Sequence, residues 1–126
     1  MLMTFRMTEG KPYVVVVEDD PLILTLVHDA LEMEGFEPIG FNHPFKIETL
    51  TVDPALFLFD LMLPDQTGIE LAERLREDGY AEAPMIAMSA SPVMIEHARQ
   101  TDLFEAVLTK PFDLDQLLQT VEQLAA

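Results

Sequence analysis

The chain has 126 residues, a length that suits one domain with a single hydrophobic core. It contains no cysteine, which excludes disulfides, thiolate metal sites and cysteine nucleophiles. Lys and Arg number 7 against 23 Asp and Glu, so the formal net charge is −16. Such a surface repels the phosphates of nucleic acids and anionic lipid headgroups. We therefore expect neither nucleic acid nor a membrane as a direct partner.

The N-terminal segment lacks the apolar core of a signal peptide, and no apolar stretch of the sequence is long enough to span a bilayer. These features favour a cytoplasmic protein. We expect residues 1–10 to be a disordered extension and residues 11–126 to form the domain. The first strand is predicted at YVVVV, residues 13–17, because an unbroken β-branched run is typical of a strand covered on both faces.

A helix and an edge strand are predicted next. Asp20 followed by Pro21 is typical of a helix start, since Asp caps the free backbone N–H groups and Pro fits the first turn. This helix is expected to continue to Gly35. A short strand is predicted at residues 36–41, and Pro38 places it at a sheet edge because proline cannot donate a hydrogen bond to a neighbouring strand.

The middle of the chain predicts a short helix, a buried strand and a longer helix. Residues 43–50 favour the short helix, and ALFLF at residues 55–59 is the second unbroken apolar strand. Thr67 and Glu70 have the spacing of a capping box, which predicts a helix from there to Gly79.

Two more strand and helix pairs complete the pattern. Strands are predicted at residues 84–88 and 106–109, and a helix is predicted to start at Ser91. The last helix begins after Asp113 and has a continuous apolar stripe. The stripe consists of Leu114, Leu117, Leu118, Val121 and Leu124.

Strands that alternate with helices predict a parallel sheet, because parallel neighbours need long, right-handed crossover connections. We therefore predict an α/β fold of the flavodoxin-like, doubly wound class, with five parallel strands in the order 2-1-3-4-5 and helices on both faces. In this order ligands bind beyond the carboxyl ends of the strands.

Polar residues follow four of the buried strands at the point where each strand ends. Because the carboxyl ends of parallel strands meet at one edge of the sheet, we expect these side chains to converge. They are Glu18 and Asp19 after the first strand, Asp60 after the third, Ser89 after the fourth and Lys110 after the fifth.

Three carboxylates close together repel one another, and each close pair costs about 4 kcal/mol at an effective dielectric near 20. One Lys cannot offset three acids, and an all-oxygen pocket favours Mg²⁺ as the bound cation. Asp60 beside a cation, an ammonium and a hydroxyl has the parts needed to accept a phosphoryl group. The three histidines, by contrast, lie on separate predicted elements without ligand spacing, and we expect no metal from them. They are His28, His43 and His97.

In four motifs the sequence resembles the receiver domain of bacterial two-component response regulators, the CheY-like superfamily. The motifs are VVVVEDD, FDLMLPDQTG, MIAMSAS and TKPF, and the resemblance extends from Tyr13 to Leu124. The second motif has Asp60, Pro64 and Gly68 at the family's intervals, and the last has Lys110 before a proline whose peptide bond is usually cis in this family.

The resemblance implies a role for each of these positions. Asp60 is expected to take a phosphoryl group from a histidine kinase or phosphotransfer protein, and Ser89 and Lys110 to hold that group. Mg²⁺ is expected on Asp19, Asp60 and the backbone carbonyl of Met62, with Glu18 acting through water. The modified state is expected to be read by an unidentified downstream protein on the face built from the helix after Ser91, strand 106–109 and the last helix.

One position departs from the family pattern. Three residues before the Lys, the family has Tyr or Phe as a switch, and here this switch position is Val107. Phe104 is near in sequence and is a candidate to pack in the same region. The last helix carries no Lys or Arg, which weakens charge-paired dimers, so a monomer or weak dimer is expected.

Three alternatives remain at this level. The chain could be a stand-alone regulator or a fragment of a longer regulator or hybrid kinase. It could be a degenerate receiver that binds partners without phosphorylation, as Val107 suggests. A phosphatase of the haloacid dehalogenase type also uses an Asp nucleophile, but it needs a second acid two residues later, where this chain has Met62. We expect no enzymatic activity beyond the chain's own phosphorylation and dephosphorylation.

Overall fold

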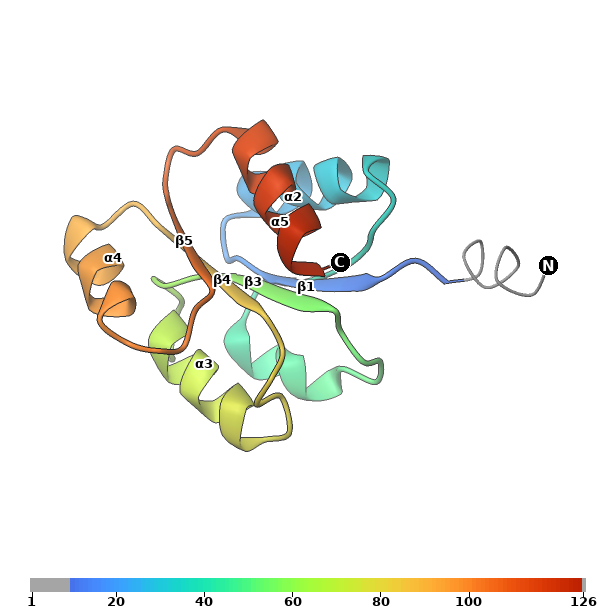
Figure 1. Ribbon diagram of the computed structural model, residues 1–126. Helices are drawn as coiled ribbons and strands as arrows, with labels where there is room; N and C mark the ends of the chain where they lie inside the picture. Colours follow the sequence, from blue (N-terminus) through green and yellow to red (C-terminus); the bar gives the residue numbers. More distant parts are fainter. Residues whose placement is uncertain (1–9, 126) are drawn as a thin grey trace.

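The computed structural model describes residues 10–125. Apart from Gly10, the expected N-terminal extension lies outside this range. The described residues form one parallel sheet with helices between its strands (Figure 1). In chain order the elements are β1 (Tyr13–Val17), α2 (Pro21–Met33), β2 (Glu37–Phe41), η1 (Pro44–Thr49), β3 (Leu56–Asp60), α3 (Gly68–Glu77), β4 (Met85–Ser89), α4 (Pro92–Arg99), β5 (Ala106–Thr109) and α5 (Leu114–Ala125).

The sheet has five strands in the order β2-β1-β3-β4-β5, and every neighbouring pair is parallel. This confirms the predicted fold class and strand order. Within residues 10–125, β2 lies at one edge of the sheet and pairs with β1 alone, in agreement with the position that Pro38 predicted.

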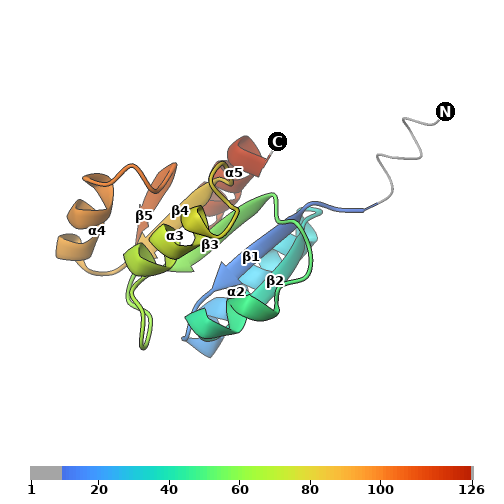
Figure 2. The same cartoon turned by 90° about the horizontal axis from the view of Figure 1, so that it is seen from below.

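Two layers of helices cover the sheet. α2 and α5 lie on one face, and η1 and α3 lie on the other, with α4 beside β4 and β5 (Figures 1 and 2). Successive residues of β1 point to opposite faces, so Val14 and Val16 pack under α2 and α5, whereas Val15 and Val17 pack under η1 and α3. Water is therefore excluded from both faces of the central strands.

The predicted capping residues start their helices. Asp20 Oδ1 accepts hydrogen bonds from the backbone N–H groups of Leu22 (2.9 Å) and Ile23 (3.3 Å). Thr67 and Glu70 form the reciprocal capping box, at 3.2 and 2.9 Å. These caps fix where the loops that precede α2 and α3 end.

The segment predicted as a short helix is a 3-10 helix, η1. The backbone N–H of Lys46 donates to the carbonyl of His43 (3.2 Å), and that of Leu50 donates to Ile47 (3.0 Å). Both bonds span three residues, which is the tighter pattern that short helical segments adopt.

Gly68, the first residue of α3, lies against the backbone of the preceding loop. A Cβ at this position would lie 2.5 Å from the carbonyl oxygen of Asp60 and 2.7 Å from the Cα of Leu61. The helix therefore approaches the end of β3 more closely than any side chain allows.

We predict that Gly68→Ala lowers the free energy of unfolding by about 2–3 kcal/mol, because backbone atoms must shift to admit the methyl group. The matched control is Gly79→Ala. Gly79 has φ +110°, but a Cβ added there would meet no other atom within 4 Å, so this change costs only about 1 kcal/mol of backbone strain. Urea denaturation measures both, and equal losses would contradict the close approach of α3 to β3.

Candidate functional site

The carboxylates of Glu18 and Asp60 lie side by side at the carboxyl edge of the sheet. Glu18 follows β1 directly, Asp60 is the last residue of β3, and the register of the two strands pairs Val17 with Phe59. Glu18 is 1% exposed and Asp60 is 5% exposed. Two buried acids at neighbouring strand ends need a positive partner, because an uncompensated buried charge is strongly disfavoured.

Lys110 supplies that positive charge. Its Nζ donates to Glu18 Oε1 and to Asp60 Oδ2, both at 2.5 Å. The residue follows β5, its backbone N–H donates to the carbonyl of Ser89 (2.8 Å), and its peptide bond to Pro111 is cis. One ammonium group therefore joins the ends of β1, β3 and β5.

The protonation equilibria of Glu18 and Lys110 follow from this shared burial. Burial raises the pKa of Glu18, and the hydrogen bond from Lys110 offsets only part of that effect. For Lys110 burial alone would lower the pKa, but hydrogen bonds to Asp60 and Glu18 outweigh it and raise the pKa above its ordinary value. The ammonium is thus firmly charged, whereas ionised Glu18 is incompletely compensated.

Asp19 completes a group of three acids. One carboxylate oxygen from each of Glu18, Asp19 and Asp60 lies within 4.8 Å of the other two, and Asp19 is exposed. With all three ionised, three negative charges face the single positive charge of Lys110, which leaves a charge of −2. The surplus and the all-oxygen donor set suit a hard divalent cation.

Met62 and Ser89 lie at the margins of the site. The backbone N–H of Met62 donates to Asp60 Oδ1 (2.8 Å), while its side chain is 55% exposed. Ser89 is fully buried at the end of β4, and its Oγ accepts a hydrogen bond from the backbone N–H of Ser91 (3.0 Å). Ser91 in turn caps α4, so the Ser89 hydroxyl is bonded to the residue that starts this helix.

Val107 lies on β5 opposite Ala87 of β4. Both side chains are small, and Phe104 from the connection between α4 and β5 packs against the same cluster. The ring of Phe104 meets that of Phe59 edge to face, with centroids 5.8 Å apart. An aromatic side chain is therefore present in this region, although it comes from a different position in the sequence.

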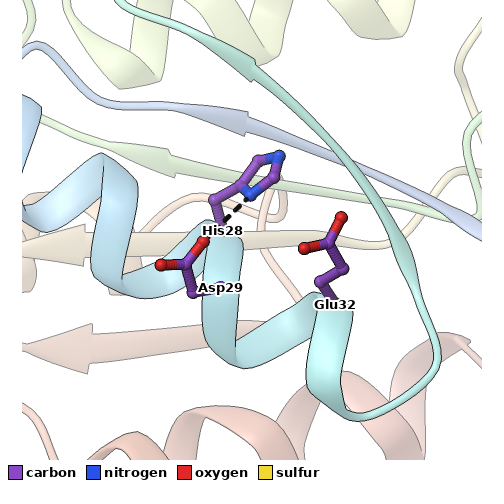
Figure 3. A group of neighbouring side chains, drawn as sticks. All are labelled: His28, Asp29 and Glu32. Carbon is purple, nitrogen blue, oxygen red and sulfur yellow. Dashed lines mark ion pairs between the residues drawn. The ribbon is translucent and has the colours of Figure 1, made fainter.

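A second group of potential metal ligands lies on α2, where we expected none from histidine. His28, Asp29 and Glu32 stand within one turn of the helix, and His28 Nδ1 lies 3.5 Å from Asp29 Oδ1 (Figure 3). His28 and Glu32 are spaced i, i+4, which places them on one face of the helix, and Asp29 lies next to His28 in the chain. Asp29 and Glu32 are exposed, so water can solvate their charges without a bound cation. Glu18 and Asp60, by contrast, are buried.

Among residues 10–125, no helix combines the length and apolar character needed to cross a membrane.

Comparison with curated proteins gives relatives along most of the chain. The DNA-binding dual master transcriptional regulator RpaA of Synechocystis sp. is 33% identical over 117 residues, which cover 90% of this chain and 48% of the relative. The polar-differentiation response regulator DivK of Brucella anthropi is 28% identical and is matched over 92% of its length, with 86% of this chain covered. The chain thus spans about half the length of the RpaA relative and nearly all of DivK.

Solved structures give the same fold. The receiver domain of the Francisella response regulator 1452 has a TM-score of 0.79 and 27% identity, with 91% of this chain and 97% of that chain covered. The response regulator TrrA of Thermotoga maritima, solved in complex with Mg²⁺ and BeF, has a TM-score of 0.77 at 24% identity, with 90% and 98% covered. At that identity the second likeness concerns the fold alone.

A family model matches most of the chain. The model of the response regulator receiver domain matches residues 14–122, a range that holds all of the site residues described above. This chain therefore belongs to the response regulator receiver domain family of two-component systems.

Proposed function

We propose that this chain accepts a phosphoryl group on Asp60 from a histidine kinase or phosphotransfer protein in the cytoplasm, and that it signals through protein contacts. The observation that carries the proposal is the contact of Lys110 Nζ with two buried carboxylates, Glu18 and Asp60, at the carboxyl edge of the sheet. A purely structural ion pair needs one acid. This site holds more acid than it can neutralise, as expected of a site that binds a cation and a phosphoryl group.

The proposed step moves one phosphoryl group. A carboxylate oxygen of Asp60 forms a bond to phosphorus while the phosphorus–nitrogen bond of a phosphohistidine breaks, and the imidazole nitrogen leaves with the electron pair. Two donors orient the Asp60 carboxylate beforehand: the Met62 N–H on Oδ1 and the Lys110 ammonium on Oδ2. Lys110 and the hydroxyl of Ser89 then hold oxygens of the transferred group.

The donor set fits Mg²⁺. Asp19, Asp60 and the carbonyl of Met62 would hold the ion, with Glu18 acting through water, and the ion would supply positive charge to the phosphoryl oxygens. Burial disfavours the ionised form of Glu18 and so raises its pKa. A bound cation would favour the ionised form and offset this effect. The charge of −2 that remains beside Lys110 favours the same ion.

We propose that the phosphodonor docks in an apolar groove that opens beside Lys110. The groove has a volume of about 450 Å³ and is lined by Ile23 and Leu26 of α2 and by Phe112 and Leu114 near the start of α5. Leu26 is 49% exposed and adds to the apolar lining of the groove, and a contiguous apolar patch of this kind often marks an interaction site. Because α2 and α5 carry no Lys or Arg, we expect the docking surface of the donor to combine apolar side chains with positive charge.

The output of the domain is proposed to leave from the face built from α4, β5 and α5. The Ser89 hydroxyl is bonded to the N-cap residue of α4, so its movement toward a phosphoryl group would release that contact. Phe104 packs between this region and Phe59, the neighbour of Asp60 in β3. We propose that α4 and Phe104 report the change that an aromatic residue at position 107 reports in other family members.

Incubation with acetyl phosphate and Mg²⁺ is predicted to add one phosphoryl group to the wild type, as seen by intact-mass spectrometry. Asp60→Asn is predicted to abolish the addition, because an amide is not a nucleophile of this kind. The control Asp102→Asn changes an exposed acid outside the site and is predicted to leave the addition intact. Labelling of the Asp60 variant would contradict the site, and no labelling of the wild type would favour the degenerate, phosphorylation-independent receiver.

Without metal, Glu18→Gln is predicted to raise the free energy of unfolding at pH 7. The raised pKa of Glu18 means that the folded state binds this proton more tightly than the unfolded state. Protonation of Glu18 therefore stabilises the fold fully at pH values below the unfolded pKa of 4.5, and this contribution is lost as the pH rises through the folded pKa. The advantage of the variant should shrink as the pH falls toward 4.5.

Urea denaturation in the presence of a chelator measures this difference, and Glu96→Gln on the exposed side of α4 is the control. Addition of Mg²⁺ should stabilise the wild type more than Glu18→Gln. Equal stability of the two proteins at pH 7 would show that Lys110 fully compensates the charge of Glu18. That result would contradict the surplus of negative charge at the site.

Leu26→Glu is predicted to slow phosphotransfer from the preferred member of a panel of autophosphorylated histidine kinases by about tenfold or more, because it removes an apolar contact and adds charge. Labelling by acetyl phosphate should not change, since that donor needs no docking surface. Met33→Glu, at an 87% exposed position of the same helix, is the matched control. Unchanged transfer to the Leu26 variant would place the docking surface elsewhere.

A further inference from the structure

We propose that His43 is a positioning residue for the phosphoryl-transfer site, and that it acts through Asp65 to hold the loop that carries the Met62 carbonyl. The inference rests on the proposed function, because it concerns the Mg²⁺ ligand that this loop supplies. His43 Nε2 lies 2.8 Å from Asp65 Oδ2, although the two residues are 22 positions apart in the chain.

The loop of residues 61–67 joins β3 to α3. The backbone N–H of Leu61 donates to the carbonyl of Met88 in β4 (2.8 Å), which fixes the start of the loop to the sheet. The N–H of Gly68 donates to the carbonyl of Leu61 (2.9 Å), which ties the two ends of the loop together. Within the described part of the chain, the contact of Asp65 with His43 is the only hydrogen bond that joins residues 63–66 to another element. Asp65 also has φ +65°, a left-handed conformation that is uncommon outside glycine and that Asp adopts more readily than most other residues.

His43 is itself held in place. Its Nδ1 accepts a hydrogen bond from the backbone N–H of Phe45 (3.1 Å), so Nε2 carries the proton and donates it to Asp65. The ring also meets that of Phe45 edge to face, with centroids 4.9 Å apart. The imidazole is therefore fixed in both tautomer and orientation before it contacts the loop.

Arg74 of α3 ties the same region to the helix that follows the loop. Its guanidinium donates to the carbonyl of Pro44 (3.2 Å) and lies 6.0 Å from the centre of the Phe45 ring. The loop is therefore linked to η1 in two ways. Asp65 contacts His43 directly, and α3, which follows the loop, contacts η1 through Arg74. Together these two links limit how far the loop can move relative to β3.

A fixed loop matters for the metal site that we propose. Mg²⁺ requires near-ideal octahedral geometry with short bonds, so a ligand carbonyl on a mobile loop binds it less well. The N–H of Met62 is held by Asp60, but its carbonyl belongs to the peptide unit that leads into the loop. The contact of His43 with Asp65, three residues later, restrains that unit from its other side.

The test is a double-mutant cycle in Mg²⁺ affinity, measured by isothermal titration calorimetry with MgCl₂. His43→Asn keeps an acceptor that can cap η1 but is too short to reach Asp65. Asp65→Gly removes the acceptor and tolerates the positive φ. Each variant is predicted to weaken Mg²⁺ binding by about threefold to tenfold, and the double variant is predicted to be no weaker than the weaker single variant.

Two readouts separate positioning from a loss of stability. The rate of labelling by acetyl phosphate at saturating Mg²⁺ should stay near that of the wild type, while the Mg²⁺ concentration for half-maximal rate rises. Lys46→Ala is the matched control, because it removes a 2.8 Å hydrogen bond to Asn42 in the same region without touching the loop. It should leave Mg²⁺ affinity unchanged.

Mg²⁺ affinities of both single variants within about twofold of the wild type would overturn the proposal, whatever their thermal stability, because a tenfold change corresponds to 1.4 kcal/mol and is well resolved. Additive losses in the double variant would overturn it as well. If the wild type binds no Mg²⁺, the proposed function itself fails, and that result is distinguishable from loss of the coupling alone.

Discussion

The ammonium group of Lys110 between two buried carboxylates is the interaction on which the rest of the site depends. Glu18 and Asp60 are almost fully buried at the ends of β1 and β3, and neither could remain ionised there without a nearby cation. Lys110 reaches both across β4, over sequence separations of 92 and 50 residues. The ion pair therefore exists only when four parallel strands end in register at one edge, and it couples the chemistry of the site to the fold.

The apolar strands behind this edge strengthen the electrostatic interactions among the charged groups of the site. β3 and β4 are buried along their whole length, with helices on both faces. Low surrounding polarity strengthens the pull between Lys110 and its partners, and it also strengthens the repulsion among the acids that Lys110 cannot neutralise. The same burial that stabilises the fold thus leaves an acidic site whose repulsion a bound cation would relieve.

Sequence patterns predicted the fold and the convergence of the site because both follow from periodic or local signals. Unbroken apolar runs identified the central strands, Pro38 identified the edge, and strand order then brought Glu18, Asp60 and Lys110 together. The roles of these residues in catalysis and metal binding remain proposals.

Contacts between irregular segments could not be predicted in the same way. The hydrogen bond of His43 with Asp65 joins two loops with no repeating pattern, and it depends on a side-chain direction set by the cap of η1. The group of His28, Asp29 and Glu32 does follow helical spacing and could have been found (Figure 3). Phe104 reaches the region of Val107 through a loop conformation that no local rule specifies.

A crystal structure with Mg²⁺ and beryllofluoride, a mimic of the phosphoryl group, tests the central claim most directly. We predict the metal on Asp19, Asp60 and the carbonyl of Met62, beryllium on Asp60, and Lys110 and Ser89 in contact with the fluorides. Lys110 would then exchange at least one of its carboxylate contacts for a fluoride. A metal bound only at His28 on α2, or a mimic that binds away from Asp60, would contradict the assignment of this site.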